Sequence, residues 1–496
     1  MTTYIPKKLR SPLPVVLENR IAWSIGKEDQ STGLDMVAGP FFSEEEALDE
    51  IGDTGLSLYK IEKDSTDKTW EWDDTNFYWK KVEANEFKLS EDQRDALVGL
   101  KSWLANSETY FILSGLAGTG KSYLVSQLRS LTKNNIVFTA TTNKSAKNLQ
   151  SLIGESVSTT YSALGLRMEQ QEEKLILVKK DNSPYFPKGS ILLIDEAGTA
   201  PIVLVDAIKE AANEHGLKVI LVGDPLQLPP VGEKRSKSWK LTENKVFLRK
   251  VVRYDNAILS LSVKIRSNIK NKIWESPIRT DVDKDGNGVH LLSKKEFFSK
   301  LSLITLDTCR DIKIGAWRNS VIDAYNKKIR LSLGFEETFC ENDQILLKTP
   351  LKEDKKIIAH IDDDFTVRKV QDSYVNTIVG RTDTTLLSVV QNDTGLRYSI
   401  HIPRNTILFN EQLTELAELA KSTRNSRQPW KNFWEFKDSF ASVRYGYAMT
   451  AHRLQGSTYK EMFIDQRDIL SNPNDLESFK CLYVASSRPT TNLYTF

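Results

Sequence analysis

The sequence has few of the residues that build disulfide or metal frameworks. Among its 496 residues are only five histidines and three cysteines, Cys309, Cys340 and Cys481. The wide spacing of the cysteines excludes a disulfide scaffold and a zinc site, and it is typical of a reducing compartment. The histidines show no metal-ligand spacing either.

Long hydrophobic runs are also missing. No apolar stretch approaches the ~20 residues that cross a bilayer, and the N-terminus has no signal-peptide core. We therefore expect a cytoplasmic protein without a membrane partner. Hydrophobic residues make up 40% and charged residues 27%, as in an ordinary globular protein, and the length requires more than one core.

A strong net charge is absent too, since the chain carries only +2. That figure hides a division: residues 1–85 carry 10 basic and 17 acidic side chains, and the rest carries 58 and 49. The pattern indicates an acidic module joined to a mildly basic body whose surface binds a polyanion. A random distribution of surface charge is the alternative.

One glycine-rich segment points to a nucleoside triphosphate. It follows an apolar run (110–113) and precedes a helix-like run (122–131), the context of a phosphate-binding loop. Glycines let backbone N–H groups face the phosphates, the lysine reaches the β- and γ-phosphates, and the final hydroxyl binds Mg²⁺. A plain glycine-rich turn is the alternative. The segment includes Gly115, Ala117, Gly118, Thr119, Gly120, Lys121 and Ser122.

Short apolar runs alternate with helix-like stretches from residue 89 to about 267. Strand-like runs cover 110–114, 136–140, 190–194 and 218–222. Buried parallel strands with crossover helices give this pattern, so we expect an α/β fold with a doubly wound sheet. A polar insertion at 167–188 interrupts it and is expected to form a hairpin.

Polar residues follow two of these strands. Asp195 and Glu196 end one apolar run, where Asp195 can hold the Mg²⁺ bound by Ser122 and Glu196 can activate water. Gln227, in a proline-rich turn after the next strand, can sense the γ-phosphate and pass its movement on. The alternatives are a charged helix start and a plain turn.

Three further side chains are candidates for contacting the nucleotide. Ser90 and Gln93 form a capping box, and a glutamine amide can also read adenine; the two interpretations are compatible. Arg253 and Arg488 are candidate arginine fingers, which would stabilise charge on the transferred phosphate. Each arginine alone could equally be a surface ion-pair partner.

The rest of the chain predicts two more regions and an accessory module. Strand-like runs at 312–317, 443–449, 461–465 and 492–496 indicate a second α/β region, split by a β-rich insertion at 341–410. A helical, then basic and aromatic, stretch follows (411–440). Residues 1–85 are expected to form a small α+β module, with strands near 21–25, 56–61 and 70–79 and a helix at 43–51.

Taken together, these segments resemble superfamily 1 helicases of the 1B branch, the RecD/Dda-like group. The resemblance runs from about residue 89 to 496. It is carried by Gln93, 115–122, 139–146, 158–161, 195–196, 223–230, Arg253, 317–319, 447–457 and 483–488.

The resemblance implies two RecA-like P-loop domains with ATP and Mg²⁺ between them and an SH3-like β-barrel insertion. The domains would then be 1–85 (accessory module), 86–270 (first RecA-like domain), 271–340 with 441–496 (second), and 341–440 (insertion with helical arm). It also implies that Gly456 contacts ATP.

Single-stranded DNA is expected to cross the tops of both domains. Hydroxyl, amide and basic groups after strands contact phosphates without reading sequence. The candidates are Thr139, Thr141, Asn143, Thr159, Thr450, His452 and Arg453. The resemblance places a strand-separating pin in 167–188, where Tyr185 and Phe186 are the available aromatics; packing onto their own sheet is the alternative.

We therefore expect an ATP-dependent DNA helicase acting in replication or recombination, with 5′→3′ movement implied by the resemblance. An RNA-directed helicase of the same superfamily and a strand-stimulated ATPase that does not unwind are the alternatives. We expect a monomer in the cytoplasm (of a host, if phage-encoded) whose acidic module recruits a replication protein.

Overall fold

The computed structural model describes residues 22–29, 33–41, 57–61, 69–73 and 78–82 as backbone. It further describes 89–116, 118–171, 174–179, 186–230, 232–250, 257–336, 338–353, 356–423 and 428–496, except for the side chains of 168–171 and 174–176. Residues 1–90 and 91–496 form separate units, and each is described by itself.

The N-terminal unit contains antiparallel strands, and one of them, at 33–41, was not expected from the sequence. Strand β1 (Ala22–Asp29) pairs with β2 (Gly33–Phe41) on one side and β3 (Ser57–Ile61) on the other. Strands β4 (Thr69–Asp73) and β5 (Tyr78–Val82) form a hairpin. The helix expected at 43–51 lies outside the described residues.

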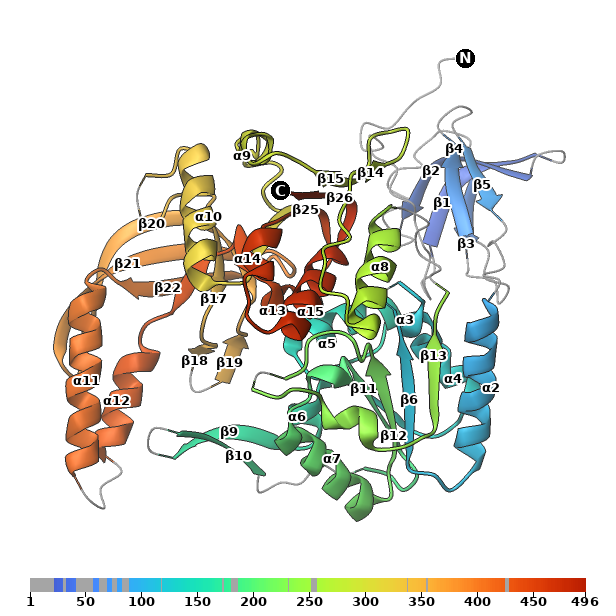
Figure 1. The fold of residues 1–496 in the computed structure, drawn as a ribbon, viewed down its shortest axis with the longest axis horizontal. Helices are drawn as coiled ribbons and strands as arrows, with labels where there is room; N and C mark the ends of the chain where they lie inside the picture. Colours follow the sequence, from blue (N-terminus) through green and yellow to red (C-terminus); the bar gives the residue numbers. More distant parts are fainter. Residues whose placement is uncertain are drawn as a thin grey trace. The chain divides into compact units, whose positions relative to one another are not determined.

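The first sheet of the larger unit is parallel throughout, with the order β13-β6-β12-β11-β7-β8 (Figure 1). Its strands are β6 (Tyr110–Gly115), β7 (Ile136–Ala140), β8 (Ser158–Thr159), β11 (Ile191–Asp195), β12 (Lys218–Gly223) and β13 (Lys245–Leu248). The helices in this part are α2 (Glu91–Ala105), α3 (Lys121–Ser126), α4 (Leu128–Leu131), α5 (Asn143–Ile153), α6 (Thr160–Ala163) and α7 (Ile202–His215), with 3₁₀ turns at Ala197–Thr199 and Lys237–Lys240.

The central strands of this sheet are apolar because both of their faces are covered. Leu192 and Ile194 of β11 pack with the buried side chains of α7, among them Leu204 and Ile208. Side chains alternate along a strand, so Leu193, also fully buried, points to the opposite face. The continuous apolar run at 191–194 is thus the mark of a sheet interior.

The polar insertion forms the expected hairpin. Strand β9 (Leu166–Gln171) pairs antiparallel with β10 (Lys174–Lys179). Figure 1 shows the hairpin leaving the first sheet beside α6. Lys179 at its base forms an ion pair of 2.8 Å with Glu214 of α7, which ties the hairpin to the sheet's outer layer.

The second sheet has the order β14-β15-β26-β25-β16-β24, parallel except for the edge strand β14. Its strands are β14 (Asp281–Val282), β15 (Gly288–Leu291), β16 (Ile312–Ala316), β24 (Ala448–Thr450), β25 (Tyr459–Ile464) and β26 (Pro489–Thr495). Its helices are α8 (Ala257–Asn271), α9 (Lys294–Leu301), α10 (Asn319–Ser332), α13 (Ala451–Leu454), α14 (Gln466–Leu470) and α15 (Asp475–Ser486).

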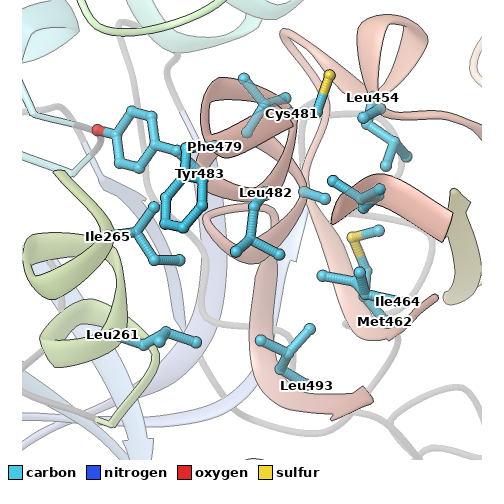
Figure 2. Packing of buried hydrophobic residues seen from close by; sticks show 14 of the residues in the cluster. Leu261, Ile265, Leu454, Met462, Ile464, Phe479, Cys481, Leu482, Tyr483 and Leu493 are labelled. Carbon is cyan, nitrogen blue, oxygen red and sulfur yellow. The ribbon is translucent and has the colours of Figure 1, made fainter. Parts of the chain in front are cut away.

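Helix α8 packs on this second sheet, although the sequence placed it at the end of the first domain. Figure 2 shows Leu261 and Ile265 of α8 facing Tyr483 and Leu482 of α15, above Leu493 of β26. The apolar side chains of α8 pack on α15, which follows about two hundred residues later. Local sequence does not reveal such a distant partner.

An antiparallel sheet interrupts the second parallel sheet in sequence. Its order is β22-β21-β20-β17-β23. The strands are β17 (Gln344–Leu347), β20 (Asp364–Thr377), β21 (Gly380–Gln391), β22 (Arg397–Pro403) and β23 (Val443–Tyr445), and β18 (Leu351–Glu353) and β19 (Lys356–Ala359) form a small hairpin. Helices α11 (Thr406–Ser422) and α12 (Gln428–Asp438) follow and lie side by side (Figure 1).

The run 443–449, expected as one strand, divides between two sheets. Strand β23 pairs with β17 of the antiparallel sheet, and β24 pairs with β16 of the second parallel sheet. Among the described helices, none combines the length and the apolar character that a bilayer crossing needs.

Candidate nucleotide site

One cavity of about 450 Å³ is lined by residues from both parallel sheets. Lys121 at the start of α3, Asp195 at the end of β11 and Gln227 in the turn after β12 reach it from the first sheet. Gly456 and Arg488 reach it from the second. The structure thus brings together side chains that lie up to 367 positions apart and that the sequence assigned to one nucleotide.

The phosphate loop joins β6 to α3 by a path that needs glycine. Gly118 and Gly120 have φ values of 77° and 80°, in the left-handed region. A Cβ on Gly120 would lie 2.4 Å from the Gln93 amide nitrogen, so a larger residue would strain the backbone and displace the Gln93 amide. Ala117, the remaining loop candidate, lies outside the described residues.

The Lys121 ammonium is held by the loop itself. It donates hydrogen bonds of 3.0 and 2.7 Å to the carbonyl oxygens of Gly115 and Leu116. Burial lowers its pKa, and the nearby carboxylates of Asp224, Glu196 and Asp195 act in the opposite direction. A half-buried cation at the mouth of a glycine loop is positioned to receive an anionic ligand.

The two carboxylates after β11 fit a divalent cation. Burial raises the pKa of Asp195 to about 7, and repulsion from Glu196 adds to the rise. A cation would relieve the cost of that buried charge. The Ser122 hydroxyl lines the same cavity and, with the Asp195 carboxylate, supplies the hard oxygen ligands that Mg²⁺ takes.

Two polar atoms at this cavity are buried without a hydrogen-bond partner among the described residues: Gln227 Oε1 and Arg488 Nη2. The remaining nitrogens of Arg488 are fixed, because Nε donates to the Val484 carbonyl at 3.1 Å and Nη1 to the Ser457 carbonyl at 3.3 Å. A buried orphan group calls for a partner that completes it. The free end of Arg488 therefore fits an anion in the cavity.

A buried ionic network joins the walls of the cavity. The Asp224 carboxylate, after β12, lies 2.5 Å from Arg266 Nη1 of α8 and accepts a 2.7 Å hydrogen bond from the Tyr483 hydroxyl of α15. Burial and the Asp224 charge raise the pKa of Tyr483, so the hydroxyl stays protonated and donating. The network connects the first sheet to the helix that leads to Arg488.

Gln93 is placed against the phosphate loop. Its side chain is 1% exposed, and its amide nitrogen donates to the Thr119 carbonyl at 3.0 Å. It therefore braces the loop's backbone, and the residues lining the cavity do not include it.

Several of the residues expected to contact DNA instead form hydrogen bonds within the protein. Thr139 is fully buried, and its hydroxyl donates to the Leu193 carbonyl at 2.7 Å. The Thr141 hydroxyl lies 2.5 Å from that of Thr199, and the Thr159 hydroxyl caps α6 by accepting from Ser162 N. Thr139 in particular presents no hydroxyl to DNA, because it is buried in β7, an interior strand of the sheet.

The other candidates for DNA contact lie at or just after the ends of β-strands. Asn143 is half-buried at the start of α5, and Thr450 precedes α13. The His452 ring lies between Glu477 (3.5 Å from Nε2) and Cys481 (4.0 Å from Nδ1), and burial lowers its pKa. Arg453 pairs with Asp362 of the antiparallel sheet at 3.0 Å.

Phe186 is a core residue and not an exposed wedge. It is 7% exposed and packs against the His215 ring at 5.2 Å between centroids, within the cluster under α7. Its position beyond β10 takes it away from the hairpin's turn. Tyr185 and Arg253 lie outside the described residues.

Sequence reasoning missed the Asp224–Arg266–Tyr483 network. The signal for Asp224 was present, since a Gly-Asp pair ends the β12 run. Arg266 gave none: a basic residue on an amphipathic helix is normally exposed, and only the fold buries this one.

The parallel first sheet, its glycine loop and the cavity define a P-loop nucleotide-binding protein. In agreement, the AAA domain family (AAA_30) matches residues 88–276. The ATP-dependent DNA helicase dda of Enterobacteria phage T4 is 25% identical, over 76% of this chain and 92% of that protein. An uncharacterized protein of Acanthamoeba polyphaga mimivirus is 24% identical, over 78% and 95%.

A solved Pif1 helicase from Bacteroides, in complex with ADP-AlF3 and ssDNA, is 14% identical with a TM-score of 0.44, covering 82% of this chain and 92% of that chain. The ATP-dependent DNA helicase Pif1 of Bdellovibrio bacteriovorus is 26% identical over 52% of this chain and 65% of its own length. The chain is thus similar to superfamily 1B helicases of the Dda and Pif1 kind.

We predict that Tyr483→Phe lowers the free energy of unfolding by about 1.5–3 kcal/mol, because the Asp224 carboxylate loses a hydrogen bond in a buried site. Chemical denaturation measures the change. Tyr374→Phe is the matched control, since its side chain is 50% exposed. Equal effects of the two substitutions would contradict the role of the network.

Proposed function

We propose that this protein is an ATP-dependent DNA helicase that moves along single-stranded DNA and unwinds duplex ahead of it. The observation that carries the proposal is the cavity with Lys121 on one wall and the unpartnered end of Arg488 on the other. A triphosphate held from both sides links its own cleavage to relative movement of the two sheets. The relatives named as DNA helicases support this function.

Each residue at the cavity has a proposed role in hydrolysis. Lys121 exchanges its loop carbonyl partners for the β- and γ-phosphates, and Gly456 closes the cavity from the second sheet. Ser122 and Asp195 would hold Mg²⁺, which would supply positive charge to the phosphates. Glu196 takes the proton of the attacking water, and Gln227 orients that water or senses the γ-phosphate.

Arg488 supplies positive charge to the phosphate as the bond to the leaving group breaks, and the sequence adds Arg253 as a second candidate. Because Arg488 follows α15, whose Tyr483 binds Asp224, closure of the cavity and placement of the arginine belong to one movement. Gln227 lies in the same turn as Asp224, so a change of the bound nucleotide at Gln227 would affect the Asp224–Arg266–Tyr483 network.

The strand is proposed to lie across the ends of β7 and β24, near Asn143, Thr450, His452 and Arg453. Polarity is taken as 5′→3′, as the 1B resemblance implies. We further propose that the protein acts as a monomer in the cytoplasm, in replication or recombination, and that residues 1–85 recruit a replication protein through their acidic surface.

Lys121→Ala is expected to lower ATP turnover by about two orders of magnitude or more, because the phosphates lose their half-buried cation. Binding to a labelled oligonucleotide should stay close to wild type. Phosphate release and fluorescence anisotropy measure the two. Lys101→Ala, an exposed lysine on α2, is the control, and turnover retained by the Lys121 variant would reject the site.

Arg488→Ala is expected to lower kcat by about 10³-fold with a much smaller change in KM for ATP, since a finger acts on the transition state. Arg381→Ala, whose side chain is 65% exposed, should leave both parameters unchanged. Equal losses in kcat and in ATP affinity would argue against the finger role.

Unwinding of tailed duplexes tests polarity and substrate. Strand displacement should occur from a 5′ single-stranded DNA overhang and not from a 3′ overhang. Unwinding from the 3′ overhang alone would reverse the polarity, and stronger stimulation of ATP turnover by RNA than by DNA would favour the RNA-directed alternative. Strand-stimulated ATP turnover without displacement of any duplex would favour a switch.

A further inference from the structure

Four cations gather where the proposed strand path crosses both parallel sheets. Lys144 and Lys147 lie on the first two turns of α5, directly after β7. Arg453 lies on α13, after β24, and Lys313 on β16. Lys144, Lys147 and Arg453 follow the carboxyl ends of β7 and β24, where nucleic-acid phosphates would pass, whereas Lys313 is buried near the amino end of β16. The four side chains form what we call the cation cluster.

Four aspartates of the antiparallel sheet already face this cluster. Asp362 and Asp363 form the turn before β20, Asp364 is the first residue of β20, and Asp393 follows β21. Lys147 Nζ lies 2.9 Å from Asp363 and 2.8 Å from Asp393, and Arg453 lies 3.0 Å from Asp362. Lys313 lies 3.9 Å from Asp364. We call these four residues the acidic turn.

Lys144 completes the set. Burial acts to lower the pKa of Lys144, but Tyr459 first and then the charges of Asp364 and Asp362 raise it overall. The Lys144 ammonium also lies 5.9 Å from the centre of the Tyr459 ring. Four positive and four negative charges thus meet across an interface between the antiparallel sheet and the two parallel sheets.

The acidic turn is built to present its carboxylates. Asp362 has a φ of 62°, an unusual backbone conformation for a residue other than glycine. Asp363 is fixed from behind, because it accepts hydrogen bonds from His360 N at 2.8 Å and from the Gln391 amide at 2.9 Å. Lys147 and Asp393 are 37% and 49% exposed, and such ion pairs add little to folding stability. Stability alone is therefore a poor reason for the Lys147–Asp393 pair.

We propose that the acidic turn is an autoinhibitory contact, in which the carboxylates of Asp362, Asp363, Asp364 and Asp393 occupy the places of nucleic-acid phosphates on the cation cluster. The inference rests on the proposed function, since it requires a strand that binds there. When nucleic acid binds, the cations exchange their carboxylate partners for phosphates. The antiparallel sheet is then released from α5. In the free protein the cations stay paired, which suppresses weak binding to other polyanions.

The contact also lies next to the nucleotide cavity. Ser145 and Asn148 of α5 line that cavity, and the Asn148 amide donates to the Gly456 carbonyl on its far wall. Lys144 and Lys147 therefore share a short helix with residues at the nucleotide. Exchange at the cation cluster is placed to change the position of that helix.

The test measures affinity for a dye-labelled oligo-dT strand by fluorescence anisotropy, without nucleotide and at low salt. Neutralising two carboxylates with Asp363→Asn and Asp393→Asn should tighten binding about two- to five-fold, because Lys147 becomes free for phosphate. Raising the salt concentration should shrink the gain. Asp383→Asn, whose side chain is 65% exposed beside Arg381, should leave the affinity unchanged.

A double-mutant cycle separates exchange from general repulsion. Lys147→Met should weaken strand binding more in the Asp363→Asn, Asp393→Asn background than in the wild type, because only there is the lysine unpaired. Purely additive effects would mean that the aspartates act at long range, and would overturn the proposal. Unchanged or weaker binding by the doubly neutralised protein, with a lowered melting temperature, would show a structural brace and would also overturn it.

The two proposals fail in different ways. If the wild type binds no strand and its ATP turnover does not respond to one, the proposed function falls and this inference falls with it. If the wild type binds a strand and unwinds duplex, but the Asn variants gain no affinity, only the autoinhibitory contact is rejected.

Discussion

The buried carboxylate of Asp224 holds the two halves of the nucleotide cavity in one arrangement. Arg266 supplies the opposite charge from α8, and Tyr483 supplies a hydrogen bond from α15, so three segments far apart in sequence meet on one side chain. A buried charge without both partners would be costly. The position of Gln227, three residues beyond Asp224, and that of Arg488, five beyond Tyr483, therefore depend on this one contact.

The parallel strands could be predicted because burial on both faces produces a continuous apolar run in the sequence. The runs at 136–140 and 218–222 are apolar at almost every position and became β7 and β12. Partners that are distant in sequence leave no such pattern. The apolar face of α8 predicts that the helix is buried, but it does not identify the packing partner. Residues 443–449 have the pattern of a single strand, although they divide between two sheets.

The candidate site divides in the same way. Lys121, Ser122, Asp195 and Glu196 stand in a local order set by the chemistry of phosphate and cation, and the structure gathers them in one cavity. Thr139 and Phe186 matched the residue types expected at a strand track or a pin, but burial decided their roles. No local signal distinguishes Lys147, because its ion-pair partners are aspartates more than two hundred positions away.

Strand β26, residues 489–495, lies between β15 and β25 and not at an edge of the second sheet. Every strand of the first sheet has been synthesised by residue 248, whereas the second cannot close until residue 495 has left the ribosome. During translation, the lobe that carries Lys121 can therefore form while the arginine lobe is incomplete. A nascent chain of that length would have the Lys121 wall of the cavity without the Arg488 wall.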